Sequence, residues 1–122
     1  MPDTVRLREN LGIIQVHSFG ETSNETMLES RKALVRICQK TDIAGILVDA
    51  RESNSIPSIF AVLDFGANLF NYDFIPRTTR FAVVPPKKKK EDCGYFVTVC
   101  QKRGLLIQLF DTVGKAQKWL VS

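Results

Sequence analysis

Three serine hydroxyl groups follow one another closely in the stretch LVDARESNSIPS, residues 47–58. Ser53 and Ser55 stand just before a segment with helical spacing and Ser58 lies in its first turn, so a phosphoryl group there would meet free backbone N–H groups and the positive end of a helix dipole. The other interpretation is structural, because Ser55 stands directly before a helical first turn that contains Pro57. We expect Ser55 to cap the helix, and Ser53, Ser55 and Ser58 are the candidate sites of a phosphorylation switch.

Asp49 stands near the end of the apolar run AGILVDA, residues 44–50, which is typical of a buried parallel strand. The carboxyl ends of such strands are where α/β sheets tend to bind ligands, so Asp49 is a candidate binding carboxylate. Two structural roles are open to it as well: it can cap a turn, or it can pair with Arg51 or Arg80. No second carboxylate is placed beside it by the sequence, so acid–base chemistry by paired carboxylates is not expected.

Four consecutive lysines, Lys87, Lys88, Lys89 and Lys90, form the one cluster of charge in the sequence. They precede an expected helix whose amino-terminal end is already positive, so together they would attract an anion. The candidates are a phosphate, an acidic protein partner or an anionic membrane surface, and the alternative is a solvated charged run. No aromatic residues alternate with the lysines to stack on bases, so nucleic acid is not an expected partner.

The sequence lacks the residue sets of the common catalytic and metal sites. There is no glycine-rich phosphate loop, no nucleophile elbow and no Ser-His-Asp triad, and the single histidine, His17, suits a polar position on a half-buried strand. The three cysteines form no CxxC pair, which argues against a disulfide framework and a zinc site. We therefore expect no enzymatic activity, no catalytic residues, no metal and no cofactor.

The overall composition is that of an ordinary globular chain. A length of 122 residues suits one domain, predicted to span 1–122, and a net charge of +4 is too small to indicate nucleic-acid binding without a patch. The apolar runs are far shorter than the roughly 20 residues that a membrane-spanning helix needs. The first residues also lack an apolar signal core, so a cytoplasmic protein that is not transmembrane is expected.

Hydrophobic spacing predicts strands that alternate with helices. The expected strands cover 4–8, 12–18, 44–50, 80–84 and 105–110, and the expected helices cover about 22–40, 56–71, 88–102 and a last helix that follows Asp111 or Thr112. This β-β-α-β-α-β-α-β-α order predicts a single α/β domain with a mostly parallel five-stranded sheet and an antiparallel first strand. If each strand lies beside the previous one, the helices should gather on one face of the sheet.

The helix expected at 56–71 is apolar on two sides. One stripe suits the core, and a second stripe consists of Val62, Phe65 and Leu69. This second stripe is covered either by another copy of the chain or by the following loop at 71–79, and a homodimer interface is the preferred interpretation. A pocket between this helix and the loop is the alternative, and it would take a small or lipid-like ligand.

Several stretches resemble the STAS-like (sporulation anti-sigma-factor-antagonist-like) domain family, in particular its broad bacterial branch of small proteins. These stretches are GIIQVHSFGET followed by a helix, GILVDAR followed by a helix, RFAVV, and the ending QKRGLLIQLFDTVGKAQKWL. The resemblance implies a non-enzymatic α/β domain that acts through protein contacts or, in some members, binds a small or lipid-like ligand.

In the regulatory members of this family, a kinase phosphorylates a serine in an Asp-Ser-Ser-Gly type turn after the third strand. The matching place here is DARESNSIPS, where Asp49 has the expected position but no Ser-Gly pair follows directly. The resemblance therefore implies a protein-interaction or regulatory module with an unknown protein partner, and the alternative is a small-ligand or lipid-binding domain.

Overall fold

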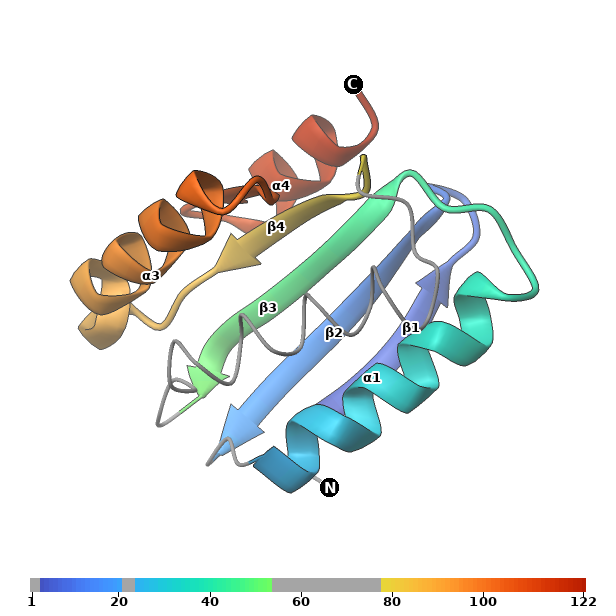
Figure 1. Ribbon diagram of the computed structural model, residues 1–122, viewed down its shortest axis with the longest axis horizontal. Helices are drawn as coiled ribbons and strands as arrows, with labels where there is room; N and C mark the ends of the chain where they lie inside the picture. Colours follow the sequence, from blue (N-terminus) through green and yellow to red (C-terminus); the bar gives the residue numbers. More distant parts are fainter. Residues whose placement is uncertain (1–2, 21–23, 54–77) are drawn as a thin grey trace.

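The computed structural model describes residues 3–20, 24–53 and 78–122 (Figure 1). Its strands are β1 Asp3–Arg8, β2 Ile13–Gly20, β3 Gly45–Ser53, β4 Arg80–Val84 and β5 Leu106–Leu109. Its α-helices are α1 Asn24–Cys38, α3 Lys90–Lys102 and α4 Val113–Leu120, and a short 3-10 helix, η1, covers Lys87–Lys89. The helix expected at 56–71 lies outside the described residues.

The five strands form one sheet in the order β1-β2-β3-β4-β5. A tight turn joins the first two: the backbone N–H groups of Leu11 and Gly12 donate to the carbonyl of Arg8, and Gly12 has φ of 68°. β1 is therefore antiparallel to β2, and every later strand is parallel to its neighbour. The predicted fold class, a mostly parallel five-stranded α/β sheet with an antiparallel first strand, is confirmed.

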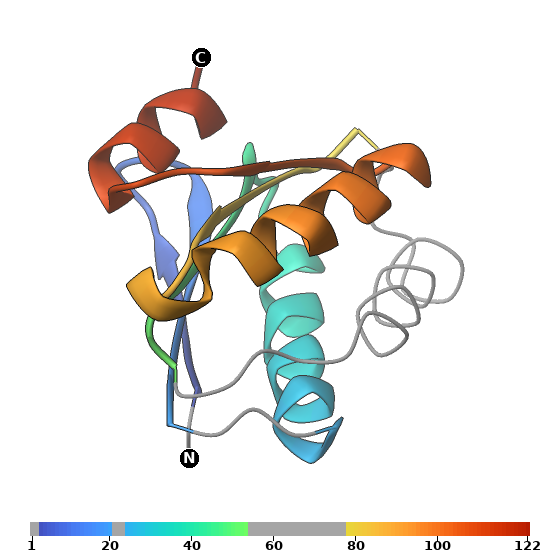
Figure 2. The same cartoon turned by 90° about the vertical axis from the view of Figure 1, so that its left-hand side faces the viewer.

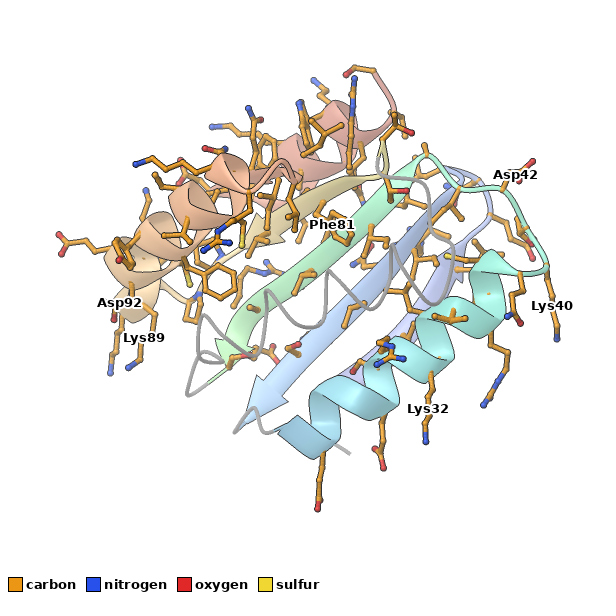
Figure 3. All side chains as sticks on the ribbon, viewed as in Figure 1. Lys32, Lys40, Asp42, Phe81, Lys89 and Asp92 are labelled. Atoms are coloured by element: carbon orange, nitrogen blue, oxygen red, sulfur yellow. The ribbon has the colours of Figure 1, made fainter. Side chains whose placement is uncertain are left out.

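One face of the sheet is covered by α1 and α3. Ile14 of β2, Ile46 of β3 and Phe81 of β4 form the centre of this core, and Leu34 of α1 and Val97 of α3 pack onto them. Figure 3 shows Phe81 on this face, while Lys32 points from α1 away from the sheet. Each helix thus buries one apolar stripe and leaves its charged side in water.

The opposite face carries α4, as Figure 2 shows. Ala116 and Leu120 of α4 pack against Leu47 of β3 and Ala82 of β4. The prediction that the helices gather on one face is therefore wrong for α4. Right-handed crossovers put α1 and α3 on the same side because each connects two parallel strands. α4 follows the last strand, connects to no further strand, and is free to cover the other apolar face.

The amino-terminal end of α4 is capped by Thr112, one of the two residues predicted for this role. Its hydroxyl oxygen accepts a hydrogen bond from the backbone N–H of Lys115 at 3.2 Å. Thr112→Ala should lower the free energy of unfolding by about 0.5–2 kcal/mol in urea. Thr98→Ala is the matched control, because Thr98 is exposed within α3 and its hydroxyl donates only to the carbonyl of Gly94. Equal effects of the two substitutions would contradict the capping role.

Candidate functional site

A β-bulge lies near the carboxyl ends of β2 and β3. Asp49, which was expected at the end of its strand, lies within β3, because β3 continues to Ser53. His17 pairs with Asp49, but the next pair is Phe19 with Glu52, so β3 carries one extra residue at this point. A bulge re-aims the side chains that follow it. Here the side chains of Asp49 and Arg51 contact each other, and that of Glu52 reaches His17.

Asp49 is held by Arg51. The guanidinium donates from Nε to Oδ1 and from the terminal Nη2 to Oδ2, both at 2.8 Å, and the backbone N–H of Arg51 donates to Oδ1 at 3.3 Å. The Asp49 side chain is only 4% exposed, whereas that of Arg51 is 55% exposed. Of the roles open to Asp49 from the sequence, the structure shows the pairing with Arg51. Arg80 instead donates to the carbonyl of Trp119 at 2.8 Å.

The charge state of Asp49 follows from two opposing effects. Burial by itself raises the pKa of Asp49, because it disfavours the charged form. The hydrogen bonds and positive charge of Arg51 outweigh burial and hold the pKa of Asp49 below its usual range. The same pairing raises the pKa of Arg51. Asp49 is therefore an ionised carboxylate whose oxygens are already engaged, which suits a structural anchor better than a general base.

A second pair, His17 with Glu52, lies beside the first. The His17 Nε2 atom is 3.2 Å from a Glu52 carboxylate oxygen, and their side chains are 39% and 67% exposed. This pair was not predicted from the sequence, because the two residues are 35 positions apart and meet only through the β2–β3 register and its bulge. The available signal was that both lie near the end of a strand in one parallel sheet. With Arg51, they give this edge of the sheet a polar, accessible surface.

The three candidate phosphorylation sites are only partly placed. Ser53 is the last residue of β3 and pairs with Gly20 of β2. It is buried, and its hydroxyl oxygen has no hydrogen-bond partner in the part of the chain that the structure describes. Ser55 and Ser58 lie outside the described residues. A kinase would reach the Ser53 hydroxyl only after local opening at the end of β3.

The lysine run begins the segment after β4. Lys87, Lys88 and Lys89 form the 3-10 helix η1, and Lys90 is the first residue of α3. The Lys90 ammonium lies 2.9 Å from a carboxylate oxygen of Asp111, and it lowers the pKa of Asp111. Glu91 and Asp92 follow in the first turn, and Figure 3 shows Lys89 and Asp92 at this end of α3. These acids already complement the helix dipole, so anion binding by Lys87–Lys90 stays a prediction.

The predicted homodimer interface, Val62, Phe65 and Leu69, lies outside the described residues. The predicted ligand pocket beside the loop at 71–79 falls largely outside them too. Both stay predictions.

Other reactive groups do not form a site in the described ranges. Burial raises the pKa of Cys38, Cys93 and Cys100, which disfavours the thiolate that a nucleophile or metal ligand needs. Within residues 3–20, 24–53 and 78–122, no three His, Cys, Asp or Glu residues are placed to hold a metal ion. No helix in this same part of the chain is long and apolar enough to cross a membrane.

No protein-family model and no curated protein matches the sequence. Solved structures do match the fold. An anti-sigma factor antagonist from Mycobacterium paratuberculosis superposes with a TM-score of 0.69 at 15% identity, over 98% of this chain and 93% of the other. An uncharacterized DUF3478 protein with a SpoIIAA-like fold from Shewanella loihica PV-4 gives 0.66 at 14% identity, over 97% and 91%.

The anti-sigma factor antagonist SpoIIAA in its unphosphorylated form gives a TM-score of 0.63 at 14% identity, over 97% of this chain and 95% of the other. Identities this low establish a shared fold and no more. The chain thus has the SpoIIAA-like fold of these anti-sigma factor antagonists, the STAS-like architecture that the sequence resemblance predicted.

Proposed function

We propose that this protein is a non-enzymatic regulatory module that acts by binding a partner protein, and that the partner is an anti-sigma factor. The observation that carries the proposal is the match of nearly the whole chain to two anti-sigma factor antagonists. Almost all of both chains superpose, so the likeness covers the same α/β domain in each. A shared fold does not determine the function, so the contact has to be assigned to particular residues on the surface.

The carboxyl edge of β2 and β3 supports the proposal as the contact surface. The accessible side chains there are those of Arg51, Glu52 and His17. The buried carboxylate of Asp49 fixes the orientation of the Arg51 guanidinium through their ion pair. Groups held in one orientation lose less conformational entropy when a partner binds. The alternating charges of Arg51 and Glu52 suit a partner with complementary charges at the same spacing.

Phosphorylation is the regulation that the serine cluster favours. Ser53 is the last residue of β3 and follows Glu52 directly, so a phosphoryl group on it would change the charge of this edge. Ser55 and Ser58 follow in the sequence and are the other candidates. We still expect Ser55 to act as a helix cap. Phosphopeptide mapping of the protein from its own cells tests this expectation, and quantitative phosphorylation of Ser55 would contradict it.

Isothermal titration calorimetry against the anti-sigma factors of the same genome tests the proposed function. We expect saturable binding by at least one of them. Glu52→Arg should weaken it by about tenfold or more, since it replaces an attractive contact with a repulsive one. Glu29→Arg is the matched control, because Glu29 is exposed on α1 and the net charge changes equally. Absence of binding, or equal loss in the two variants, would refute the proposal.

A further inference from the structure

β1 is an edge strand with a free edge in the part of the chain that is described. It pairs with β2 on one side only and is the outermost strand of the sheet (Figure 1). Alternate residues of such a strand direct backbone N–H and C=O groups outward, where another strand can pair with them. One face of β1 is covered, because Val5 and Leu7 are partly buried against the core under α1.

The other face of β1 is basic and uncovered. Thr4 and Arg6 are exposed and Arg8 is half-buried, and these alternate residues lie on the face away from α1. α4 covers β3 and β4 on this face. It also reaches β2, where the side-chain amide of Gln117 donates to Oε1 of Gln15 at 3.4 Å. The face of β1 thus stays accessible beside α4.

Arg6 and Arg8 form no ion pair within the described residues. Arg8 donates to the neutral amide oxygen of Gln15 at 3.2 Å. The two carboxylates farther along this side of the sheet are already engaged, Asp49 by Arg51 and Glu52 by His17. Two arginines at alternate positions of an edge strand therefore present positive charge that no ion pair among the described residues neutralises.

We propose that β1 accepts an extended acidic segment of a partner protein as a sixth strand. Alternate side chains of a strand repeat every 6–7 Å or so, and directly opposite residues of paired strands lie about 5 Å apart. A segment with Glu or Asp at alternate positions would place its carboxylates opposite Arg6 and Arg8. Each guanidinium presents a planar fork that fits a carboxylate, and the strand edge supplies main-chain hydrogen bonds.

The same charges argue against other occupants. Pairing of β1 with β1 of a second copy would bring the arginines of both copies together on one face, which like-charge repulsion disfavours. Arg6 and Arg8 also discourage a purely apolar strand, so they select among strands that approach the edge. No exposed aromatic side chain is seen on the described part of β1 to stack on bases.

Fluorescence anisotropy with a labelled peptide of about seven residues, in which Glu and Thr alternate, tests the proposal at about 50 mM salt. We expect saturable binding by the wild type. The double variant Arg6→Glu/Arg8→Glu should lose about tenfold or more in affinity and should gain binding of the matching Lys–Thr peptide. Peptide N-methylation on the pairing edge should cost about tenfold as well, since it removes main-chain hydrogen bonds. Circular dichroism checks that the variants fold, and Arg6→Gln/Arg8→Gln repeats the test without charge reversal.

Lys87→Glu/Lys88→Glu is the matched control, with the same change of net charge at exposed residues elsewhere. It should change the affinity by no more than about twofold. Failure of the wild type to bind the peptide, equal losses in the two double variants, or equal binding of the N-methylated peptide would overturn the proposal. So would stronger binding of anionic vesicles or single-stranded DNA that depends on Arg6 and Arg8. Glu52→Arg should leave peptide binding unchanged, so this surface and the proposed carboxyl-edge surface succeed or fail separately.

Discussion

Gly45→Ala is expected to lower the free energy of unfolding by about 1–3 kcal/mol. A Cβ atom on Gly45 would lie 2.6 Å from Cδ2 of Leu120 and 2.8 Å from the carbonyl oxygen of Arg80. The leucine side chain can shift, but the Arg80 oxygen belongs to the backbone of β4, which pairs with β3 at this residue. The extra methyl group must therefore distort the sheet or displace α4.

Urea unfolding followed by circular dichroism measures this loss, and Gly94→Ala is its control. A Cβ atom on Gly94 would meet only Cδ1 of Leu109, at an ordinary 3.8 Å. Gly94 lies within α3, so alanine there should raise stability by about 0.5–1 kcal/mol. If Gly45→Ala is as stable as the wild type, the close packing of α4 on the start of β3 is wrong.

Arg51→Met should produce the second large effect, a loss of about 1–3 kcal/mol at neutral pH. It removes both guanidinium hydrogen bonds and leaves the buried Asp49 carboxylate with the backbone N–H of residue 51 at 3.3 Å. The double variant Asp49→Asn/Arg51→Met should recover most of the loss, because it leaves no buried charge. Glu52→Gln is the control, since the exposed pair with His17 should contribute less than about 1 kcal/mol.

The pH dependence of the free energy of unfolding tests the same Asp49–Arg51 pair independently. Arg51 lowers the pKa of Asp49 in the folded protein, so the pair adds stability above the unfolded value of about pH 4 and loses it as pH falls through the folded pKa. Asp49→Asn should reduce this loss of stability at acidic pH. Without the Arg51 side chain, burial is opposed only by the backbone N–H of residue 51 and by His17, so the stability deficit of Arg51→Met should shrink as Asp49 takes up a proton. A deficit that stays constant from pH 7 to pH 3 would contradict this account.

Local sequence signals were sufficient to predict most of the described fold. The continuous apolar runs that became β3 and β4 are typical of strands buried on both faces, and both are central strands here. Thr112, one of the two residues expected before the last helix, marked the start of α4 correctly. The position of α4 was not predictable in this way, because a helix after the last strand is not constrained by crossover handedness.

Within the candidate site, only the contact between residues close in sequence could be predicted. Asp49 and Arg51 are two residues apart, so a pair between them can be anticipated on a strand, where such residues share a face. The contact of His17 with Glu52 depends on an extra residue in β3, and a one-residue shift in register changes which side chains face each other. The bulge itself has no marker such as glycine or proline among residues 49–52.

The carboxyl edge of β2 and β3 is the proposed binding surface for a protein partner. The most direct measurement is an NMR titration of the ¹⁵N-labelled chain with the anti-sigma factor that binds it in calorimetry. We predict that the largest shifts of backbone amide signals among the described residues occur at His17, Arg51 and Glu52. Shifts that cluster instead on α4 or on the outer side of α1, with these three residues unchanged, would contradict the claim.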